Sequence, residues 1–372
     1  MAKYNKIQKI VSTSPIMKWF ERNERRVSTF FLLTGFVVDS FTLKRVDSLF
    51  ENLWTVGLIL GASVCMVLMH HLERHTGDEN DPTKLRFWLV NMLQFFFGGL
   101  LSVFLIFYFR SSDFFVSWPF FLILAVAIIA NERLKGHYVR LTFQMSLLFL
   151  VTFCSAIFLI PVLTHKIGVE TFVLAGLLSI IFIWILIKII ARMNPKDYAR
   201  SKNMLIVSVG GIFIIMNFLY FNNWMPPIPL SLKDSGVYYD IQKQGNGQYI
   251  GRYEKTDWKA YFVLYDNFRI NSGESVYVYS AVFSPTDLNT TVKHVWQYYD
   301  PGSKDWVNYS TIELPLVGGR SGGFRTYSVN SNLMLGKWRV NVENIRGQVV
   351  GRIRFNVVQT TSFIPTETKI LE

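Results

Sequence analysis

Cysteine is scarce in this sequence. Its 372 residues include two cysteines, Cys65 and Cys154, and both lie inside apolar stretches. The part of the chain after residue 222 has none, so it must fold without disulfides. The same absence excludes a cysteine-based metal site in that part.

Charge is also in short supply. Charged residues make up 17% of the chain, whereas a soluble globular protein has about a quarter. The deficit lies before residue 222, where apolar runs follow one another with short breaks. Hydrophobic residues reach 51% of the whole and the mean hydropathy is +0.27. These values indicate a membrane-embedded first part and a polar second part.

Groups for acid–base chemistry are few as well. His294 is the one histidine after residue 222, and nothing in the sequence brings acidic residues together there. The apolar part has almost no ionisable residue at mid-depth, which disfavours an ion-coupled transporter. We therefore predict no catalytic residue and no cofactor.

Seven apolar runs are each near or above the roughly 17 residues that a membrane-spanning helix needs. The first is the weakest, because it contains Asp39. The runs are 27–43, 53–69, 87–109, 114–130, 141–163, 169–190 and 204–221.

The segments between these runs differ in basic charge. Alternate segments, beginning with the N-terminal tail, hold 17 Lys and Arg residues, against 4 in the segments on the other side. Basic segments stay in the cytoplasm, so this asymmetry predicts a cytoplasmic N-terminus. Seven crossings then place the C-terminal domain outside. The net charge of +12 is explained in the same way, and no nucleic-acid partner is predicted.

Four segments follow from this pattern. Residues 1–26 form a basic tail without the features of a cleavable signal peptide, and 27–222 form the seven-helix membrane domain. A proline-containing spacer covers 223–232, and 233–372 form the soluble domain.

The last segment alternates apolar and polar residues with period two, which is typical of β-strands. Trp338, Val340 and Val342 face inward by this alternation, and Ile353 with Phe355 continue the pattern after a turn at 344–347. Trp296 shares a face with Val292 and Tyr298, which also indicates the core. Further strands are predicted at 261–265, 276–283, 292–299, 309–316 and 324–329. The predicted fold is a membrane α-helical bundle with a C-terminal all-β, immunoglobulin-like sandwich, and a small closed barrel is the alternative.

Three stretches of this domain resemble a bacterial family, the domain of unknown function 2914. They are 314–328 (LPLVGGRSGGFRTYS), 336–340 (GKWRV) and 347–355 (GQVVGRIRF), and the strand containing His294, Val295 and Trp296 also fits. The resemblance covers roughly the last third of the chain. It implies a bacterial inner-membrane protein with a periplasmic C-terminal domain, and it carries no activity.

Candidate ligand-binding residues lie in the soluble part. Arg320 lies within the glycine-rich stretch 318–323 and Arg325 follows it, and both are suited to an anionic lipid headgroup or an acidic glycan. The alternative is a plain hairpin connection. Trp306 lies beside a turn and is the best candidate for an exposed ring, although core packing is the default for aromatic residues.

Polar residues within the apolar runs are the second set of candidates. Asp39, Asn91 and Gln94 would line a lateral cavity if the bundle handled a substrate. His71 and His75 are four apart, a spacing that zinc sites use, but the full zinc motif is missing. A solvated helix end is the favoured interpretation of these histidines, and no metal is predicted.

These observations favour a non-enzymatic inner-membrane protein that presents its sandwich to an envelope protein or a glycan. The alternative is a membrane-embedded enzyme or a lipid or solute carrier that works through the bundle. The bilayer itself is the one further partner, and the oligomeric state stays open.

The predicted orientation can be tested with a reporter fused after residue 372. A reporter that needs an extracytoplasmic environment should be active, because the basic segments hold the other side in the cytoplasm. A fusion active only in the cytosol would contradict the orientation.

Overall fold

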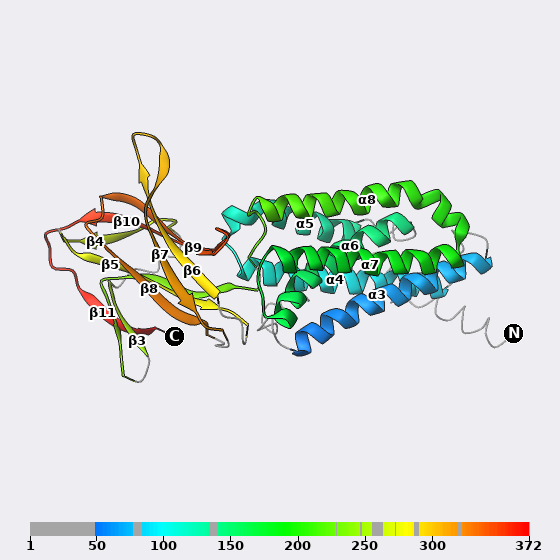
Figure 1. Ribbon diagram of the computed structural model, residues 1–372, viewed down its shortest axis with the longest axis horizontal. Helices are drawn as coiled ribbons and strands as arrows, with labels where there is room; N and C mark the ends of the chain where they lie inside the picture. Colours follow the sequence, from blue (N-terminus) through cyan, green and yellow to red (C-terminus); the bar gives the residue numbers. More distant parts are fainter. Residues whose placement is uncertain are drawn as a thin grey trace, which may run out of the picture.

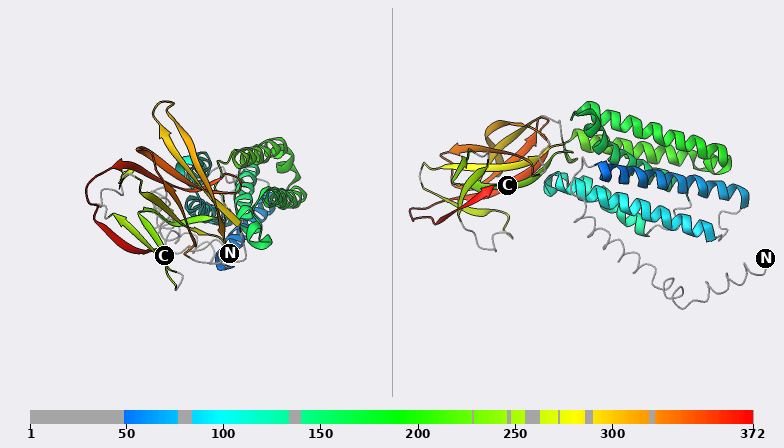
Figure 2. Two further views of the ribbon diagram at one scale, coloured as in Figure 1. Left: turned by 60° about the vertical axis from the view of Figure 1, so that its left-hand side comes forward. Right: turned by 90° about the horizontal axis from the view of Figure 1, so that it is seen from below.

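The computed structural model describes residues 49–76, 84–133, 140–227, 229–245, 248–254, 263–271, 273–285, 290–318 and 322–371. Within these ranges the helices are α3 (Leu49–Thr76), α4 (Lys84–Arg110), α5 (Phe114–Arg133), α6 (Leu141–Thr164), α7 (Val169–Met193) and α8 (Pro195–Phe221). They lie side by side in Figure 1, and the β-rich part lies beyond one end of the bundle, as it does in the right-hand view of Figure 2.

The six described helices are long and apolar enough to cross a bilayer. This finding confirms six of the seven predicted runs, and the chain is a multi-pass membrane protein. The run predicted at 27–43, including Asp39, lies outside the described residues.

Helix α8 begins nine residues before its predicted apolar run at 204. Pro195 occupies its first turn, and the side chain of Asn194 accepts a hydrogen bond from the Asp197 backbone N–H at 3.2 Å. Proline and an Asn cap are both favoured at this end of a helix. Hydropathy alone misses these turns because they are polar.

Helix α6 is the centre of the bundle and contacts α3, α4, α7 and α8. Its Phe158 ring lies 4.7 Å from the ring of Tyr108 on α4, which in turn lies 4.4 Å from Phe120 on α5. The Tyr108 hydroxyl donates to the backbone carbonyl of Cys154 at 3.3 Å. Close aromatic packing of this kind substitutes for the hydrophobic effect, which does not drive helix association within lipid.

Three sheets make up the β domain. Their orders are β1–β5–β8, β4–β10–β9–β6–β7 and β11–β3–β2. The strands are β1 (Ser231–Tyr238), β2 (Asp240–Lys243), β3 (Tyr249–Glu254), β4 (Asp266–Ile270), β5 (Ser275–Phe283), β6 (Thr290–Asp300), β7 (Asp305–Leu316), β8 (Phe324–Ser331), β9 (Gly336–Asn344), β10 (Val349–Gln359) and β11 (Thr366–Leu371).

The predicted strands from 276 onward coincide with β5 to β10. Of the strand predicted at 261–265, residues 263–265 are not in a strand, because β4 begins only at Asp266, and 261–262 lie outside the described residues. Strands β1, β2, β3 and β11 were not predicted, and β1 begins inside the segment expected to be a spacer.

A shared core joins the β1–β5–β8 sheet to the five-stranded sheet. Val276 and Val278 of β5 belong to the same buried cluster as Trp296 of β6 and Trp338 of β9. The two tryptophan rings are fully buried and meet edge to face at 6.4 Å. The predicted inward direction of both is therefore confirmed.

The turn between β9 and β10 is a hairpin, as predicted. Gly347 has φ +81 and donates its backbone N–H to the Asn344 carbonyl at 3.0 Å. A side chain would be strained at this positive φ, so glycine is needed here.

The backbone requires a glycine at position 323 for two reasons. Gly323 has φ +89, and a Cβ there would lie 2.9 Å from the backbone carbon of Ala281. Gly323→Ala should lower the free energy of unfolding by about 1–3 kcal/mol, because backbone atoms cannot move aside. Thermal unfolding of the full chain in detergent measures this.

Gly322→Ala is the matched control. A Cβ at position 322 meets nothing within 4 Å among the described residues. Equal shifts of the unfolding midpoint in the two variants would contradict the prediction.

Candidate functional site

An ion pair joins the β domain to the helix bundle. The Arg354 guanidinium on β10 donates to the Asp113 carboxylate at 2.8 Å, and Asp113 lies in the turn between α4 and α5. The two side chains are 13% and 9% exposed. Arg354 also lies over the ring of Phe115 at 5.3 Å. Separating a buried ion pair of this kind costs free energy, because each charge would be left buried without its partner.

The β9–β10 hairpin makes a second contact with the bundle. Gln348 donates its side-chain amide to the carbonyl of Met225 at 3.4 Å, just beyond the end of α8. The Arg346 guanidinium lies 4.1 Å from the ring centre of Tyr220 on α8, a cation–π contact. Asn223 donates to the Arg346 carbonyl at 3.4 Å. The five-stranded sheet is thus held to the bundle at two places.

Strand alternation puts three arginines on the outer face of this sheet. Arg352 and Arg354 alternate with the buried Phe355 on β10, and Arg339 follows the buried Trp338 on β9. Arg339 and Arg354 are direct cross-strand partners. Like charges in that position repel each other, so this pairing needs compensation.

Hydrogen bonds fix the inner nitrogens of two of these arginines. Arg339 donates its Nε–H to Gln297 at 2.7 Å, and Arg352 donates its Nε–H to Asn341 at 2.6 Å. Asn341 in turn donates to Glu343 at 2.9 Å. Both guanidinium groups are therefore oriented, and their outer nitrogens have no hydrogen-bond partner among the residues that the structure describes.

Aromatic rings lie against the same arginines. The Arg339 guanidinium lies 4.2 Å from the ring centre of Trp306 on β7. Tyr265 stacks on Trp306 at 6.2 Å, and Tyr299 meets it at 5.5 Å. We call Tyr265, Trp306, Arg339, Arg352 and Arg354 the arginine–aromatic face.

The three arginines of this face lie near the carboxylates of Asp113, Asp305 and Glu343. Burial and then the neighbouring Arg352 lower the pKa of Arg339 to about 10, so it stays protonated at neutral pH. Burial also lowers the pKa of Arg352, while Asp113 opposes that change. Burial raises the pKa of Glu343, against its bond to Asn341 and the nearby arginines. The arrangement is chemically suited to bind an oxyanion.

His294 lies beside serine hydroxyls, as many catalytic histidines do, but it is not accessible to a substrate. Its Nε2 lies 2.8 Å from the Ser280 hydroxyl, and its Nδ1 lies 2.7 Å from the Ser328 hydroxyl. Trp296 donates to Ser328 at 2.9 Å. His294 is 0% exposed, and a substrate cannot reach it there. Burial lowers its pKa to about 3.

The glycine-rich loop also has the spacing of a hydrolase motif. Gly319, Ser321 and Gly323 fit Gly-x-Ser-x-Gly, but a nucleophile elbow joins a strand to a helix. Here the loop joins strands β7 and β8. The spacing therefore gives no support to an esterase-like site.

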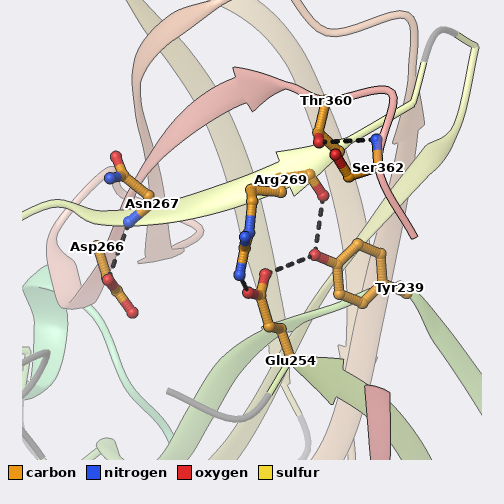
Figure 3. Close-up of polar contacts among 7 residues, drawn as sticks. All are labelled: Tyr239, Glu254, Asp266, Asn267, Arg269, Thr360 and Ser362. Carbon is orange, nitrogen blue, oxygen red and sulfur yellow. Dashed lines mark hydrogen bonds and ion pairs between the residues drawn. The ribbon is translucent and has the colours of Figure 1, made fainter. Parts of the chain in front are cut away.

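A further polar network ties β3 to β4 (Figure 3). Tyr239 donates to the Arg269 carbonyl at 2.8 Å and approaches Glu254 at 3.1 Å, and Glu254 pairs with the Arg269 guanidinium. Burial raises the pKa of Tyr239 to about 12, so the phenol stays neutral. The Tyr239 ring stacks on Phe268 at 4.4 Å. This network connects β3 to β4, which belong to different sheets, and its role is therefore structural.

The predicted ligand residues are only partly brought together. Trp306 is half-exposed and belongs to the arginine–aromatic face. Arg325 lies on β8 in the other sheet, opposite Ala281, and its Nε is buried without a hydrogen-bond partner among the described residues. Arg320 lies outside the described residues. A joint site of these three residues stays a prediction.

The predicted intramembrane set is described in part. Asn91 and Gln94 lie half-buried one turn apart on α4, and the Gln94 carbonyl accepts from Asn131 on α5 at 3.3 Å. Asp39 lies outside the described residues. The cavity expected between these residues therefore stays a prediction.

The histidine that the structure buries near the end of α3 is His70. Its Nε2 lies 3.1 Å from Gln144 on α6, and its Nδ1 lies 3.2 Å from the Asp197 carboxylate on α8. His71 is exposed on α3. No group of three or more His, Cys, Asp or Glu residues that could hold a metal occurs among the described residues. No local sequence signal connects His70 to partners so distant in the chain.

These features define a multi-pass membrane protein with a C-terminal β domain. Residues 289–357 match the family described as "Protein of unknown function (DUF2914)", which confirms the resemblance seen in the sequence. The match runs from the start of β6 into β10 and so contains Trp306, Arg339, Arg352 and Arg354. No curated protein matches the chain.

Three solved structures are similar at low level. An immunoglobulin-like protein from Pseudomonas aeruginosa is 10% identical, with a TM-score of 0.21, over 35% of this chain and 96% of its own. A β-glucosidase from Listeria innocua is 13% identical, with a TM-score of 0.19, over 30% and 16%. An alkylpurine DNA glycosylase from Pseudomonas fluorescens is 10% identical, with a TM-score of 0.22, over 84% and 99%. TM-scores in this range do not establish a shared fold.

The buried neutral His294 predicts a pH-dependent stability. Its pKa is about 3 in the folded protein and 6.5 in the unfolded chain, so the unfolded chain binds the extra proton between these values. His294 should therefore destabilise the fold as pH falls below about 6.5, by about 1.4 kcal/mol per pH unit, until about pH 3. Urea unfolding of the full chain at several pH values measures this slope.

His294→Gln is the informative variant, since it removes the proton-binding group but keeps a polar side chain. The slope between pH 4 and 6 should be smaller in the variant than in the original protein. Identical slopes in the two proteins would show that His294 is accessible to protons in the folded state.

Proposed function

We propose that this chain is a non-enzymatic binding protein of the bacterial inner membrane, which presents its β domain to an envelope partner, either a protein or a glycan. The arginine–aromatic face is the observation that carries this proposal. It combines a half-exposed tryptophan, a stacked guanidinium and oriented donors. Tryptophan, tyrosine and arginine dominate the energetics of protein interfaces, and aromatic rings also stack on sugars.

The strand order supports an immunoglobulin-like sandwich. A three-stranded sheet shares a core with a five-stranded sheet, and β4 pairs in parallel with β10 at the edge of the latter. The remaining pairs in these two sheets are antiparallel. This arrangement is suited to displaying side chains on an outer sheet face.

The helix order supports a periplasmic β domain. The α4–α5 turn and the end of α8 both contact this domain, so these helix ends lie on one side of the membrane. The α4–α5 and α6–α7 turns on that side carry few basic residues, Arg110 and Lys166. Segments poor in Lys and Arg are exported, which agrees with a domain outside the cytoplasm.

Trp306→Ala should reduce capture of the partner, because it removes the central ring of the face and the support of Arg339. We expect capture from envelope extract by the full-length protein to fall about ten-fold, as for an interface hot spot. Quantitative mass spectrometry of the captured material and glycan analysis measure this.

Phe363→Ala is the matched control. Phe363 is 92% exposed and lies in the connection between β10 and β11, outside the arginine–aromatic face. Capture should be unchanged in this variant. The proposal fails if no protein or glycan is enriched, or if both variants capture the partner as well as the original protein does.

A further inference from the structure

We propose that Arg339 and Arg352 bind a phosphate group at the membrane surface, supplied by a phospholipid headgroup. This inference goes beyond the proposed function, because its ligand is lipid and not the envelope partner. It assigns a role to the outer nitrogens of the two arginines, which the contacts with the bundle do not use.

The first argument is the state of the two guanidinium groups. Each is held by a single bond from Nε, to Gln297 for Arg339 and to Asn341 for Arg352. Their outer nitrogens have no hydrogen-bond partner among the described residues. A guanidinium oriented in this way matches two oxygens of one phosphate without losing further side-chain freedom.

The second argument is the mutual repulsion of the cations. Arg339 and Arg354 are direct cross-strand partners, and the nearby Arg352 adds a third positive charge. Asp113 forms its ion pair with Arg354 at 2.8 Å and also acts on Arg352, as Glu343 does, while Asp305 acts on Arg339. An anion between Arg339 and Arg352 would add to the attraction that these carboxylates supply and would further reduce the repulsion among the arginines.

The third argument is height above the bilayer. Gln348, four residues before Arg352, bonds to Met225 at the end of α8, and Arg354, two residues after it, bonds to Asp113. At about 3.3 Å per residue, Arg352 is about 13 Å along the chain from Gln348 and about 7 Å from Arg354. It therefore lies on the stretch between the two residues that contact the helix ends.

The rings beside this point are those of a lipid interface. Phe115 and Trp118 near the start of α5 are 61% and 54% exposed, and Phe115 lies against Arg354. Exposed aromatic residues at a helix end mark the headgroup region. A phospholipid next to α5 can therefore place its phosphate against Arg352, and this proximity favours a lipid over a free anion as the source.

Lipid retention by the full-length protein in detergent tests the proposal. Native mass spectrometry would count bound dioleoyl-phosphatidylglycerol, with dioleoylglycerol as the matching lipid without phosphate. We expect Arg352→Gln and Arg339→Gln each to retain about ten-fold less phosphatidylglycerol, and dioleoylglycerol to bind poorly. Arg352→Lys, which keeps the charge but not the fork, should fall between the original protein and Arg352→Gln.

The control is Lys369→Gln, which removes one positive charge from β11. It should retain lipid as the original protein does, and unfolding midpoints check that every variant is folded. Displacement of the lipid by excess inorganic phosphate would support the same site with a soluble phosphate as its source, and no displacement would support the headgroup. The proposal is overturned if both arginine variants retain phosphatidylglycerol fully, or if dioleoylglycerol is retained equally well.

The two proposals fail separately. Loss of lipid retention in Arg352→Gln supports the phosphate site even when no envelope partner is captured. Capture of a partner with unchanged lipid retention in both arginine variants would support the proposed function and refute the phosphate site.

Discussion

The ion pair between Arg354 and Asp113 is the interaction on which the placement of the β domain depends. It joins β10 to the α4–α5 turn, and both side chains are nearly excluded from water. A charge left alone in such surroundings is strongly disfavoured, so the pair resists separation of the two parts. The hairpin contact of Gln348 with Met225 adds a second point on the same strand pair. Contacts at two places restrict rotation of the sheet relative to the bundle more than one contact would. The same strand, β10, attaches the sheet to the bundle and carries a residue of the arginine–aromatic face. Arg352 and Arg354 are two residues apart, so the alternation that directs Arg354 toward Asp113 also puts Arg352 on the same side of the sheet.

Much of this architecture could be predicted from local pattern. The apolar runs from 53 onward correspond to six helices, because crossing a bilayer demands length and apolarity that are visible in any window. Strict alternation predicted the inward direction of Trp338 and Trp296, and both are fully buried. Strands β1, β2, β3 and β11 escaped prediction because they are short or mixed in character. The burial pattern of β1, for example, is half-exposed through most of its length. Their position is decided by pairing with β5 and with each other, not by their own sequence.

The candidate site shows where sequence reasoning stops. Trp306 was predicted as an exposed ring from the adjacent turn, and it does lie half-exposed on β7. Alternation also directed Arg339, Arg352 and Arg354 outward, but nothing marked them as a group. Their grouping depends on the register of β9 against β10 and on an aspartate 241 residues away from Arg354. His70 was missed for the same reason, since Gln144 and Asp197 lie on other helices. Contacts between residues far apart in the chain depend on how the whole chain folds, and local patterns in a single sequence do not reveal them.

The composition of the arginine–aromatic face exceeds what attachment requires. Arg354 alone pairs with Asp113, so a sheet that needed only to dock could have neutral residues at 339 and 352. Instead a second arginine stands directly opposite Arg354 and a third lies beside it, in a position where like charges weaken strand pairing. Natural sequences tolerate such local conflicts mainly where function requires them. Lysine would supply the charge at these positions, but it lacks the flat surface that stacks on Trp306 and the fork that Gln297 and Asn341 hold in place. The choice of arginine, the stacking on Trp306 and the outer nitrogens, which have no hydrogen-bond partner among the described residues, therefore favour recognition of an oxyanion as the property for which this face gives up stability.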